Sequence, residues 1–240
     1  MQIAALLTGR GNNTLKDKNL LKVNGYPLLS YPCKAAANSK YINSLWASSD
    51  CSKILKVATR NGFKSIIRPK KIAQPNSQHI DAIDHSLDEM KKQNYKPNIL
   101  VVMMANSVTI KTKWIDSCIS MFLEDKSATA VVPVYKEMDH HPYRSKKIND
   151  NGYLDTFFDF TKKKISTNRQ DLEPAYFLSH NFWVLNLDNI DREKGQKPWV
   201  FMGDKIKHFL VEGAFDVHTL EDLKKCEKWL NENNINYDRF

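Results

Sequence analysis

Apolar and polar positions alternate along the first half of the chain in the rhythm of strands followed by helices. Short continuous apolar runs are typical of strands buried on both faces of a parallel sheet, and apolar residues three or four positions apart are typical of helices packed on it. Strand patterns occupy residues 2–7, 44–48, 63–67, 98–104, 128–135 and 207–211, and helical patterns occupy residues 27–38, 51–61, 78–93, 112–124 and 219–233. This order predicts an α/β fold with a mostly parallel central sheet.

Local signals predict where several of these helices begin. Pro27 suits the first turn of the first helix, whereas Pro32 inside that helix predicts a kink or a later start. Asp50 is the expected N-cap of the second helix. Thr219, followed three residues later by Asp222, predicts an approximate capping box at the start of the last helix.

The rhythm changes over residues 138–190, which contain several short aromatic-rich segments. Asn149 to Gly152 predicts a hairpin turn inside this stretch. We therefore expect a single domain over residues 1–240, with 138–190 leaving the core as a substrate lid or a dimerisation element. Aromatic residues such as Phe182 and Trp183 are expected in the core or at a subunit contact rather than stacked on a ligand.

Composition narrows the class of partner. The chain has 240 residues, 42% of them hydrophobic, and a formal net charge of +9, which favours anionic ligands. The basic residues are not interleaved with aromatic ones as a base-stacking module requires, so no nucleic-acid partner is expected. No apolar run approaches the ~20 residues of a membrane span, and the N-terminus does not read as a signal peptide. Four scattered cysteines fit a reduced, cytoplasmic protein.

Residues 8–19, TGRGNNTLKDKN, follow the first predicted strand and carry the clearest chemical signal. In open α/β sheets, ligands bind beyond the carboxyl ends of the strands. Gly9 and Gly11 allow the backbone close to a ligand, and Arg10, Lys16 and Lys18 offer positive charge to phosphate oxygens. The loop matches neither GxGxxG nor GxxxxGK[ST]. It is predicted to bind phosphate, with a solvated surface loop as the alternative.

Four stretches, in order, resemble the acylneuraminate-type cytidylyltransferases, which synthesise CMP-sugars. The family's ARxGSKxxxxKN and NGKPLL elements resemble GRGNNTLKDKN and NGYPLL in this chain. Its STDxxEI and RPxxLA elements resemble SSDCSKI, from Ser48, and Arg68-Pro69 with Ala73. Its IDIDTPEDL element resembles FDVHTLEDL, from Phe215. The resemblance is best over residues 1–135 and 205–230.

The resemblance implies a three-layer, Rossmann-like nucleotidyltransferase fold of the glycosyltransferase-A type. It implies that CMP passes from CTP to a sugar acid or other small anionic acceptor, with release of pyrophosphate, in a homodimeric enzyme. Catalytic roles are implied for Arg10, Lys16 and Lys18, and Mg²⁺ or Mn²⁺ is expected at Asp216. The implied nucleotide-binding residues are Gly9, Arg10, Gly11, Asn12, Lys18, Asn19, Arg68, Ser77 and Asn106.

The chain departs from the family pattern at three places. Residues 12–14 are Asn-Asn-Thr where the family has Gly-Ser-Lys, and the loop is one residue shorter. After the central strand the family's arginine is absent, and Lys111 is the nearest cation. His218 stands where the family has its second metal-binding aspartate, and histidine is a poor ligand for magnesium. His218 is therefore either a ligand for a softer ion such as Mn²⁺ or a residue beside a helix cap.

These departures leave two alternatives to a CTP-dependent transferase. One is a nucleotidyl- or glycosyltransferase on the same kind of sheet that uses UTP or a different acceptor. The other is a nucleotide-binding relative that has lost catalysis, for which His218 is the main argument.

Overall fold

A sheet of eight strands organises the part of the chain that the computed structural model describes, residues 1–161 and 164–239. Seven strands follow the order β10-β7-β11-β6-β1-β4-β5, and β12 pairs with β7. Their bounds are β1 (Ile3–Thr8), β4 (Ser44–Ser49), β5 (Lys64–Ile67), β6 (Ile99–Met104), β7 (Ala130–Lys136), β10 (Tyr176–Leu178), β11 (Phe182–Asn186) and β12 (Ile206–Leu210). Two small hairpins, β2 (Lys22–Val23) with β3 (Tyr26–Pro27) and β8 (Lys146–Ile148) with β9 (Leu154–Thr156), lie outside it.

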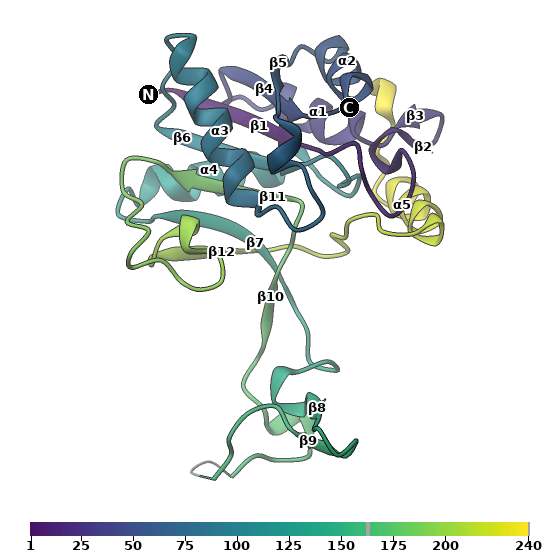
Figure 1. The fold of residues 1–240 in the computed structure, drawn as a ribbon, viewed down its shortest axis with the longest axis vertical. Coiled ribbons are helices and arrows are strands. Elements are labelled where there is room, and N and C mark those ends of the chain that lie inside the picture. The colour runs from purple at the N-terminus through teal and green to yellow at the C-terminus, as the bar shows by residue number, and fades with distance from the viewer. Residues whose placement is uncertain (162–163, 240) are drawn as a thin grey trace.

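Helices cover both faces of the sheet, which gives the predicted three-layer α/β architecture (Figure 1). Alternate side chains of β1 point to opposite faces. Leu6 joins the core beneath α3 (His79–Lys92), and Leu7 joins the larger core on the opposite face. The helices that contribute to the larger core are α1 (Ser30–Ala37), α2 (Ser52–Arg60), α4 (Thr112–Glu124) and α5 (Leu220–Glu232).

The strand order creates a switch point beside β1. Strands β5, β4, β1 and β6 are parallel, and the chain passes from β1 outward to β4 and β5 before it returns to β6 on the other side of β1. The crossovers on the two sides of β1 diverge there, so a crevice opens at the carboxyl ends of β1 and β6. The fold thus predicts the place of a ligand before any side chain is considered.

Two of the predicted helix starts are corrected by the structure. Pro27 lies in β3, and α1 begins at Ser30, so Pro32 falls within the first turn, where its missing N–H costs no helical hydrogen bond. Asp50 is not the N-cap of α2, because Cys51 occupies that position and the Asp50 carboxylate accepts a hydrogen bond from the Gly11 N–H instead (2.9 Å). The predicted capping box at Thr219 is confirmed.

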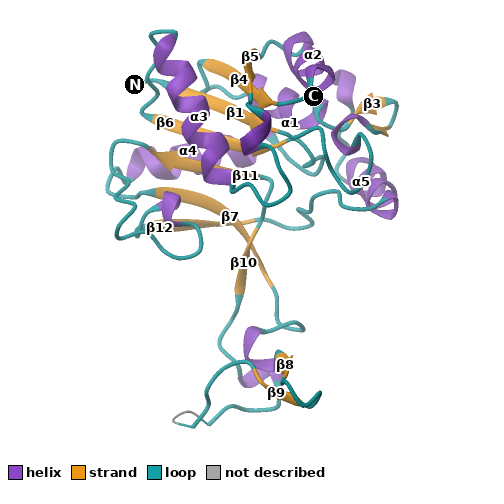
Figure 2. Cartoon of the chain, in the orientation of Figure 1, coloured by secondary structure: helices purple, strands orange, loops and turns teal. Residues whose placement is uncertain are grey.

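A long arm leaves the body between β7 and β10 and ends in the β8–β9 hairpin (Figures 1 and 2). The predicted turn from Asn149 to Gly152 joins the two strands of that hairpin. The sheet takes up more of residues 138–190 than the sequence pattern indicated. β11 runs antiparallel between β6 and β7 with all five residues buried, so Phe182 and Trp183 lie in the core. No helix within the described ranges is long and apolar enough to cross a bilayer.

Candidate active site

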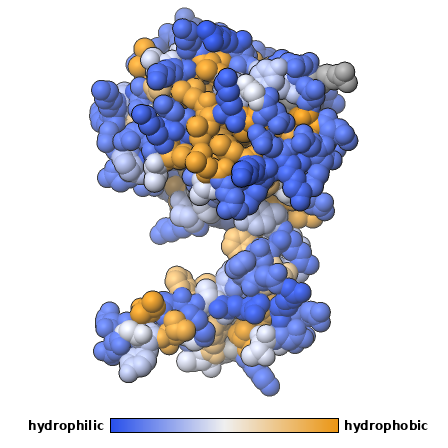
Figure 3. Space-filling model, turned by 90° about the vertical axis from the view of Figure 1, so that its right-hand side faces the viewer, coloured by the Kyte–Doolittle hydropathy of each residue, from blue (hydrophilic) through white to orange (hydrophobic). Residues whose placement is uncertain are grey.

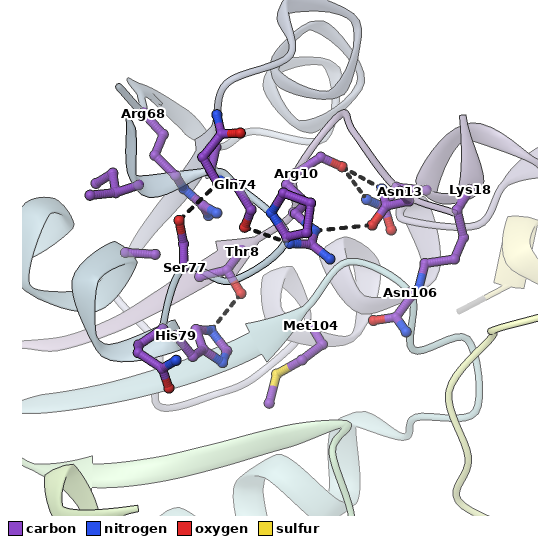
Figure 4. A pocket seen from close by; sticks show the side chains of 17 residues that line it. Thr8, Arg10, Asn13, Lys18, Arg68, Gln74, Ser77, His79, Met104 and Asn106 are labelled. Atoms are coloured by element: carbon purple, nitrogen blue, oxygen red, sulfur yellow. Dashed lines mark hydrogen bonds between the residues drawn. The ribbon is translucent and has the colours of Figure 1, made fainter. Parts of the chain in front are cut away.

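A pocket opens at the switch point between β1 and β6, where the sheet order predicts a ligand (Figure 4). Its walls come from the loop after β1, the segment between β5 and α3, and the residues that follow β6. Figure 3 shows the side of the molecule that lies on the right in Figure 1, and an apolar area surrounded by hydrophilic residues lies in the middle of that face. The residues that line the pocket include apolar Ala73 and Met104 beside charged Arg10 and Lys18, a combination that small-molecule sites share.

The loop after β1 is shaped by side chains that hold its backbone. The amide groups of Asn13 and Asn19 both donate to the Arg10 carbonyl oxygen, at 2.7 and 3.0 Å. Gly9 packs so closely on β6 that an added Cβ would lie 2.7 Å from the Cβ of Ala105. Glycine at position 9 is therefore required by close approach. The two asparagines and the glycine fix a loop that would otherwise be loose.

Positive charge gathers at one end of the pocket. Arg10 reaches across it, and its Nη1 donates to the Gln74 carbonyl oxygen of the opposite wall at 2.7 Å. Lys18 lies on the same side of the loop (Figure 4). Burial lowers the pKa of Lys18, Asp216 opposes this change, and the neighbouring Arg10 adds to it. Two cations facing a half-buried space provide a site for a polyanion.

The opposite end of the pocket is more enclosed. Arg68 is buried there, and its Nε and Nη2 donate to the Ser48 hydroxyl and carbonyl oxygens at 3.1 and 2.8 Å. Burial lowers its pKa to about 10, so the guanidinium stays charged at neutral pH. His79 contacts the Thr8 hydroxyl, with Nε2 and Oγ1 2.9 Å apart. Ala73, Ala82 and Met104 supply the apolar part of this end.

His79 makes the stability of the protein depend on pH. Burial lowers its pKa to about 4 from an ordinary 6.5, and the charges of Arg68 and His180 contribute. Between these values the unfolded chain binds a proton that the folded protein does not, so the free energy of unfolding falls as the pH falls below 6.5. We expect a loss of about 2 kcal/mol from this group between pH 7 and pH 5. Denaturant unfolding of wild type and His79→Gln at both pH values measures it, and an equal loss in both proteins would contradict it.

Asp216 lies beside the cationic end, in the loop before α5. Its Oδ2 accepts from the Asn106 amide at 2.9 Å and lies 2.8 Å from His218 Nε2. The His218 side chain is 67% exposed and that of Asp216 only 25%, so the histidine covers the carboxylate from the solvent side. Asn106 lines the pocket and thus connects Asp216 to it.

The residues around Asp216 fit a divalent ion only in part. The described residues contain no group of three or more histidines, cysteines or carboxylates arranged to hold a metal. One carboxylate with an adjacent imidazole is a sparse set of protein ligands. Mg²⁺, however, is commonly bound through one or two carboxylates together with substrate phosphates. Asp216 satisfies this arrangement if phosphates bind at Arg10 and Lys18.

The structure brings most of the predicted nucleotide-binding residues to one place. Those that line the pocket are Gly9, Arg10, Lys18, Asn19, Arg68, Ser77 and Asn106. Gly11, Asn12 and Lys16 do not line it, and Lys16 is exposed. The Ser77 hydroxyl accepts from the Gln74 N–H at 2.9 Å and so also shapes the loop between β5 and α3.

Ten lining residues were not predicted as site residues, among them Thr8, Asn13, Gln74, His79 and Met104. Thr8 and Met104 end two strands that the sequence pattern predicted, so the carboxyl-edge rule could have suggested both. Asn13 belongs to the loop that the sequence predicted to bind phosphate, whereas nothing local identifies Gln74 or His79. They reach the pocket because the loop after β1 and the segment before α3 meet across it.

Lys111 lies away from the pocket, although it is the nearest cation to the place of the family's missing arginine. Its Nζ is 5.2 Å from the ring centroids of both Trp114 and Trp229 and 2.5 Å from the Asn233 side-chain oxygen. These contacts join α4 to α5 and its C-cap. Lys111 therefore stabilises the fold and does not replace that arginine.

Replacing Lys111 by methionine should lower the free energy of unfolding by about 1–2 kcal/mol, because a charge stacked between two indole rings is lost. Nucleotide affinity should stay within about twofold of wild type, because such sites, distant from the pocket, act independently. Denaturant unfolding and titration calorimetry measure the two quantities. A large loss of nucleotide affinity in a fully folded variant would contradict this placement.

Comparison with known proteins shows similarity to cytidylyltransferases. Residues 8–187 match the family model described as cytidylyltransferase. N-acylneuraminate cytidylyltransferase A of Danio rerio is 26% identical over 155 residues, which are 64% of this chain and 34% of that protein. Pseudaminic acid cytidylyltransferase of Campylobacter jejuni is 22% identical over 69% of this chain and 70% of its own length. A Helicobacter pylori protein that joins pseudaminic acid cytidylyltransferase to a hydrolase is 23% identical over 82% of this chain and 36% of its own length. The chain thus spans about a third of the Danio and Helicobacter relatives.

Two solved structures share the fold. CMP:2-keto-3-deoxy-manno-octonic acid synthetase complexed with CTP has a TM-score of 0.69 at 14% identity, over 97% of this chain and all of that one. 4-Diphosphocytidyl-2C-methyl-D-erythritol synthase of Anaerococcus prevotii has a TM-score of 0.65 at 14% identity, over 96% of both chains. At such identities the likeness establishes the architecture alone.

Proposed function

Because the chain belongs to the cytidylyltransferase family, as a divergent member, we propose that it transfers CMP from CTP to a sugar acid and releases pyrophosphate. The observation that carries the proposal is the pocket at the switch point, which has Arg10 and Lys18 at one end and, at the other, apolar walls around the buried Arg68. A nucleoside triphosphate has the matching polarity, with charge at one end and a flat base at the other. The relatives named for N-acylneuraminate and pseudaminic acid support a sugar acid as the acceptor.

The reaction requires little covalent work from the protein. A hydroxyl of the acceptor attacks the α-phosphorus in line, the bond to the bridging oxygen breaks, and negative charge grows on the departing pyrophosphate. Arg10 and Lys18 lie where they would bind the triphosphate and stabilise that charge. Asn19 holds the carbonyl of Arg10 and so positions the loop. Catalysis of this kind depends on placement and electrostatics.

Asp216 is the residue proposed to hold Mg²⁺ or Mn²⁺, with Asn106 orienting its carboxylate. A bound divalent ion neutralises phosphate charge and orients the triphosphate. His218 is proposed as an additional ligand only for the softer Mn²⁺, because imidazole suits transition metals better than magnesium. Four cysteines without disulfides support the proposed cytoplasmic setting.

A pyrophosphate-release assay tests the function. CTP and UTP are each combined with N-acetylneuraminic acid, pseudaminic acid and 2-keto-3-deoxy-octonic acid, in the presence of Mg²⁺ or Mn²⁺. Release that requires both CTP and one of the acids is the expected result. Turnover with UTP in place of CTP would support the alternative nucleotide instead. Nucleotide binding without turnover on any acid and either ion would indicate a relative that has lost catalysis.

The arm is proposed to form a homodimer contact. Ile148, Tyr153, Leu154 and Phe157 are 59–74% exposed on it, and apolar side chains gathered in this way commonly mark an interface. Light scattering should give about twice the chain mass of 27.8 kDa. Leu154→Glu with Phe157→Glu should yield the monomer mass, because charges are buried poorly at an apolar contact. Ile67→Glu is the control, since Ile67 is 79% exposed on the body at β5. A wild-type monomer would refute the proposal.

A further inference from the structure

The hydrogen bonds around Thr8 determine which nitrogen of His79 carries the proton. The Thr8 hydroxyl has one hydrogen and two neighbours, the Met103 carbonyl oxygen at 3.2 Å and His79 Nε2 at 2.9 Å. A carbonyl oxygen can only accept, so a hydroxyl that donated to His79 would hold its own oxygen 3.2 Å from a second acceptor, whereas donation to Met103 avoids this repulsion. The hydroxyl must then accept from His79, which places the imidazole proton on Nε2. If the proton were on Nδ1, the Thr8 hydroxyl would donate to Nε2, and its oxygen would face the Met103 carbonyl oxygen with no hydrogen between them.

The other ring nitrogen of His79 is consequently an acceptor without a partner. Among the described residues, no hydrogen bond involves His79 Nδ1, and the only buried polar side-chain atom without a partner is His85 Nδ1. His79 Nδ1 is therefore accessible. Because His79 lines the pocket, a ligand there can reach this lone pair.

His79 lies at the end of the pocket where a base would be placed. Figure 4 shows His79 and Arg68 on one side of Arg10, and Lys18 with Asn13 on the other. A triphosphate bound by Arg10 and Lys18 directs its base toward the enclosed end, where Ala82 and Met104 provide apolar contact. The groups at that end are the ones positioned to distinguish one base from another.

We propose that His79 is a specificity-determining residue that selects cytosine over uracil, with Nδ1 accepting a hydrogen bond from the 4-amino group of the base. The proposal rests on the proposed function, because it assumes that a pyrimidine nucleotide occupies the pocket. Cytosine presents a donor at position 4 and acceptors at N3 and O2, whereas uracil presents an acceptor at position 4 and a donor at N3. Uracil would set its O4 against the Nδ1 lone pair, and both acceptors would lose their partners.

Arg68 completes the complementarity to cytosine. It uses Nε and one N–H of Nη2 on Ser48, and its side chain makes no other hydrogen bond with the part of the chain that the structure describes, so its remaining guanidinium hydrogens can meet acceptors such as N3 or O2. Its buried position fixes the fork of donors beside His79. One acceptor and a set of donors thus line the same end of the pocket, and the edge of cytosine requires both kinds of group.

Two variants of His79 separate the roles of its two nitrogens. In His79→Gln the amide reaches the place of Nε2 and no acceptor remains at Nδ1. In His79→Asn the side-chain oxygen takes the place of Nδ1 and the Thr8 contact is lost. Titration calorimetry with CTP and with UTP gives the ratio of their dissociation constants. We expect His79→Gln to lower the preference for CTP by about tenfold or more, and His79→Asn to keep it within about threefold of wild type.

Nitrogen chemical shifts of His79 in the wild-type protein test the tautomer without any nucleotide. A proton on Nε2 is the expected result, and a proton on Nδ1 would overturn the inference whatever the variants do. An unchanged CTP preference in His79→Gln would overturn it as well and leave the proposed function intact. A wild-type protein that binds neither CTP nor UTP would overturn the proposed function, and this inference with it.

Discussion

Replacing Lys18 by methionine should lower kcat/KM for CTP by about 100-fold or more. Lys18 lies in the pocket wall beside Arg10 and within the electrostatic influence of Asp216, at the place proposed for the departing pyrophosphate. Removing one preorganised charge of this kind typically costs ~10²–10³ in rate. Methionine keeps the length and the apolar contacts of the side chain, so the fold should be retained. Initial rates of pyrophosphate release measure the effect.

Lys16 provides the matched control for this experiment. It belongs to the same loop, two residues earlier, but it is exposed and does not line the pocket. Lys16→Met should therefore remain within about twofold of wild type, as surface charges usually do. From the sequence alone, both lysines are expected to bind the triphosphate. Equal losses in the two variants would show that the loop moves on binding and brings Lys16 to the nucleotide.

Replacing Asp216 by asparagine should abolish most of the metal-dependent activity, with a loss of about 100-fold or more in kcat. Asp216 is the carboxylate that accepts a hydrogen bond from Asn106 beside Lys18, so its loss would remove the proposed protein ligand of a divalent ion on the phosphates. Asparagine preserves the shape of the side chain and removes its charge. Titration of activity with Mg²⁺ and with Mn²⁺, after treatment with a chelator, measures the effect.

Two further variants make the Asp216 experiment specific. Glu212→Gln removes an exposed carboxylate from the same loop and should leave activity within about twofold of wild type. His218→Asp supplies a second carboxylate on the residue whose imidazole contacts Asp216, and it should raise the apparent affinity for Mg²⁺ by about tenfold. Full activity of Asp216→Asn at saturating Mg²⁺ would show that the ion is held elsewhere.

The extent of agreement between sequence and structure differs from element to element. α4 spans the residues that the periodic pattern predicted, and β6 differs from its predicted run only at the first residue, because both patterns are long and unbroken. The sequence pattern did not predict β11, because a run of five buried residues shows no alternation by which a strand can be recognised. Pro27 and Asp50 were both predicted at helix starts. In the structure Pro27 lies in β3, and Asp50 accepts a hydrogen bond from the Gly11 N–H.

The sequence by itself determined the class of the fold and the place of the loop that is proposed to bind phosphate. Both follow from local patterns, namely continuous apolar runs and a glycine-bearing basic loop directly after a strand. Only the tertiary structure decided which members of that loop face the pocket, because one turn of backbone separates exposed Lys16 from Lys18. The sequence could not identify His79 as a pocket residue either, since its proposed role depends on Thr8, which is 71 positions away in the chain. Chemistry that arises from contacts between distant segments is set by the packing of the sheet and not by any local pattern.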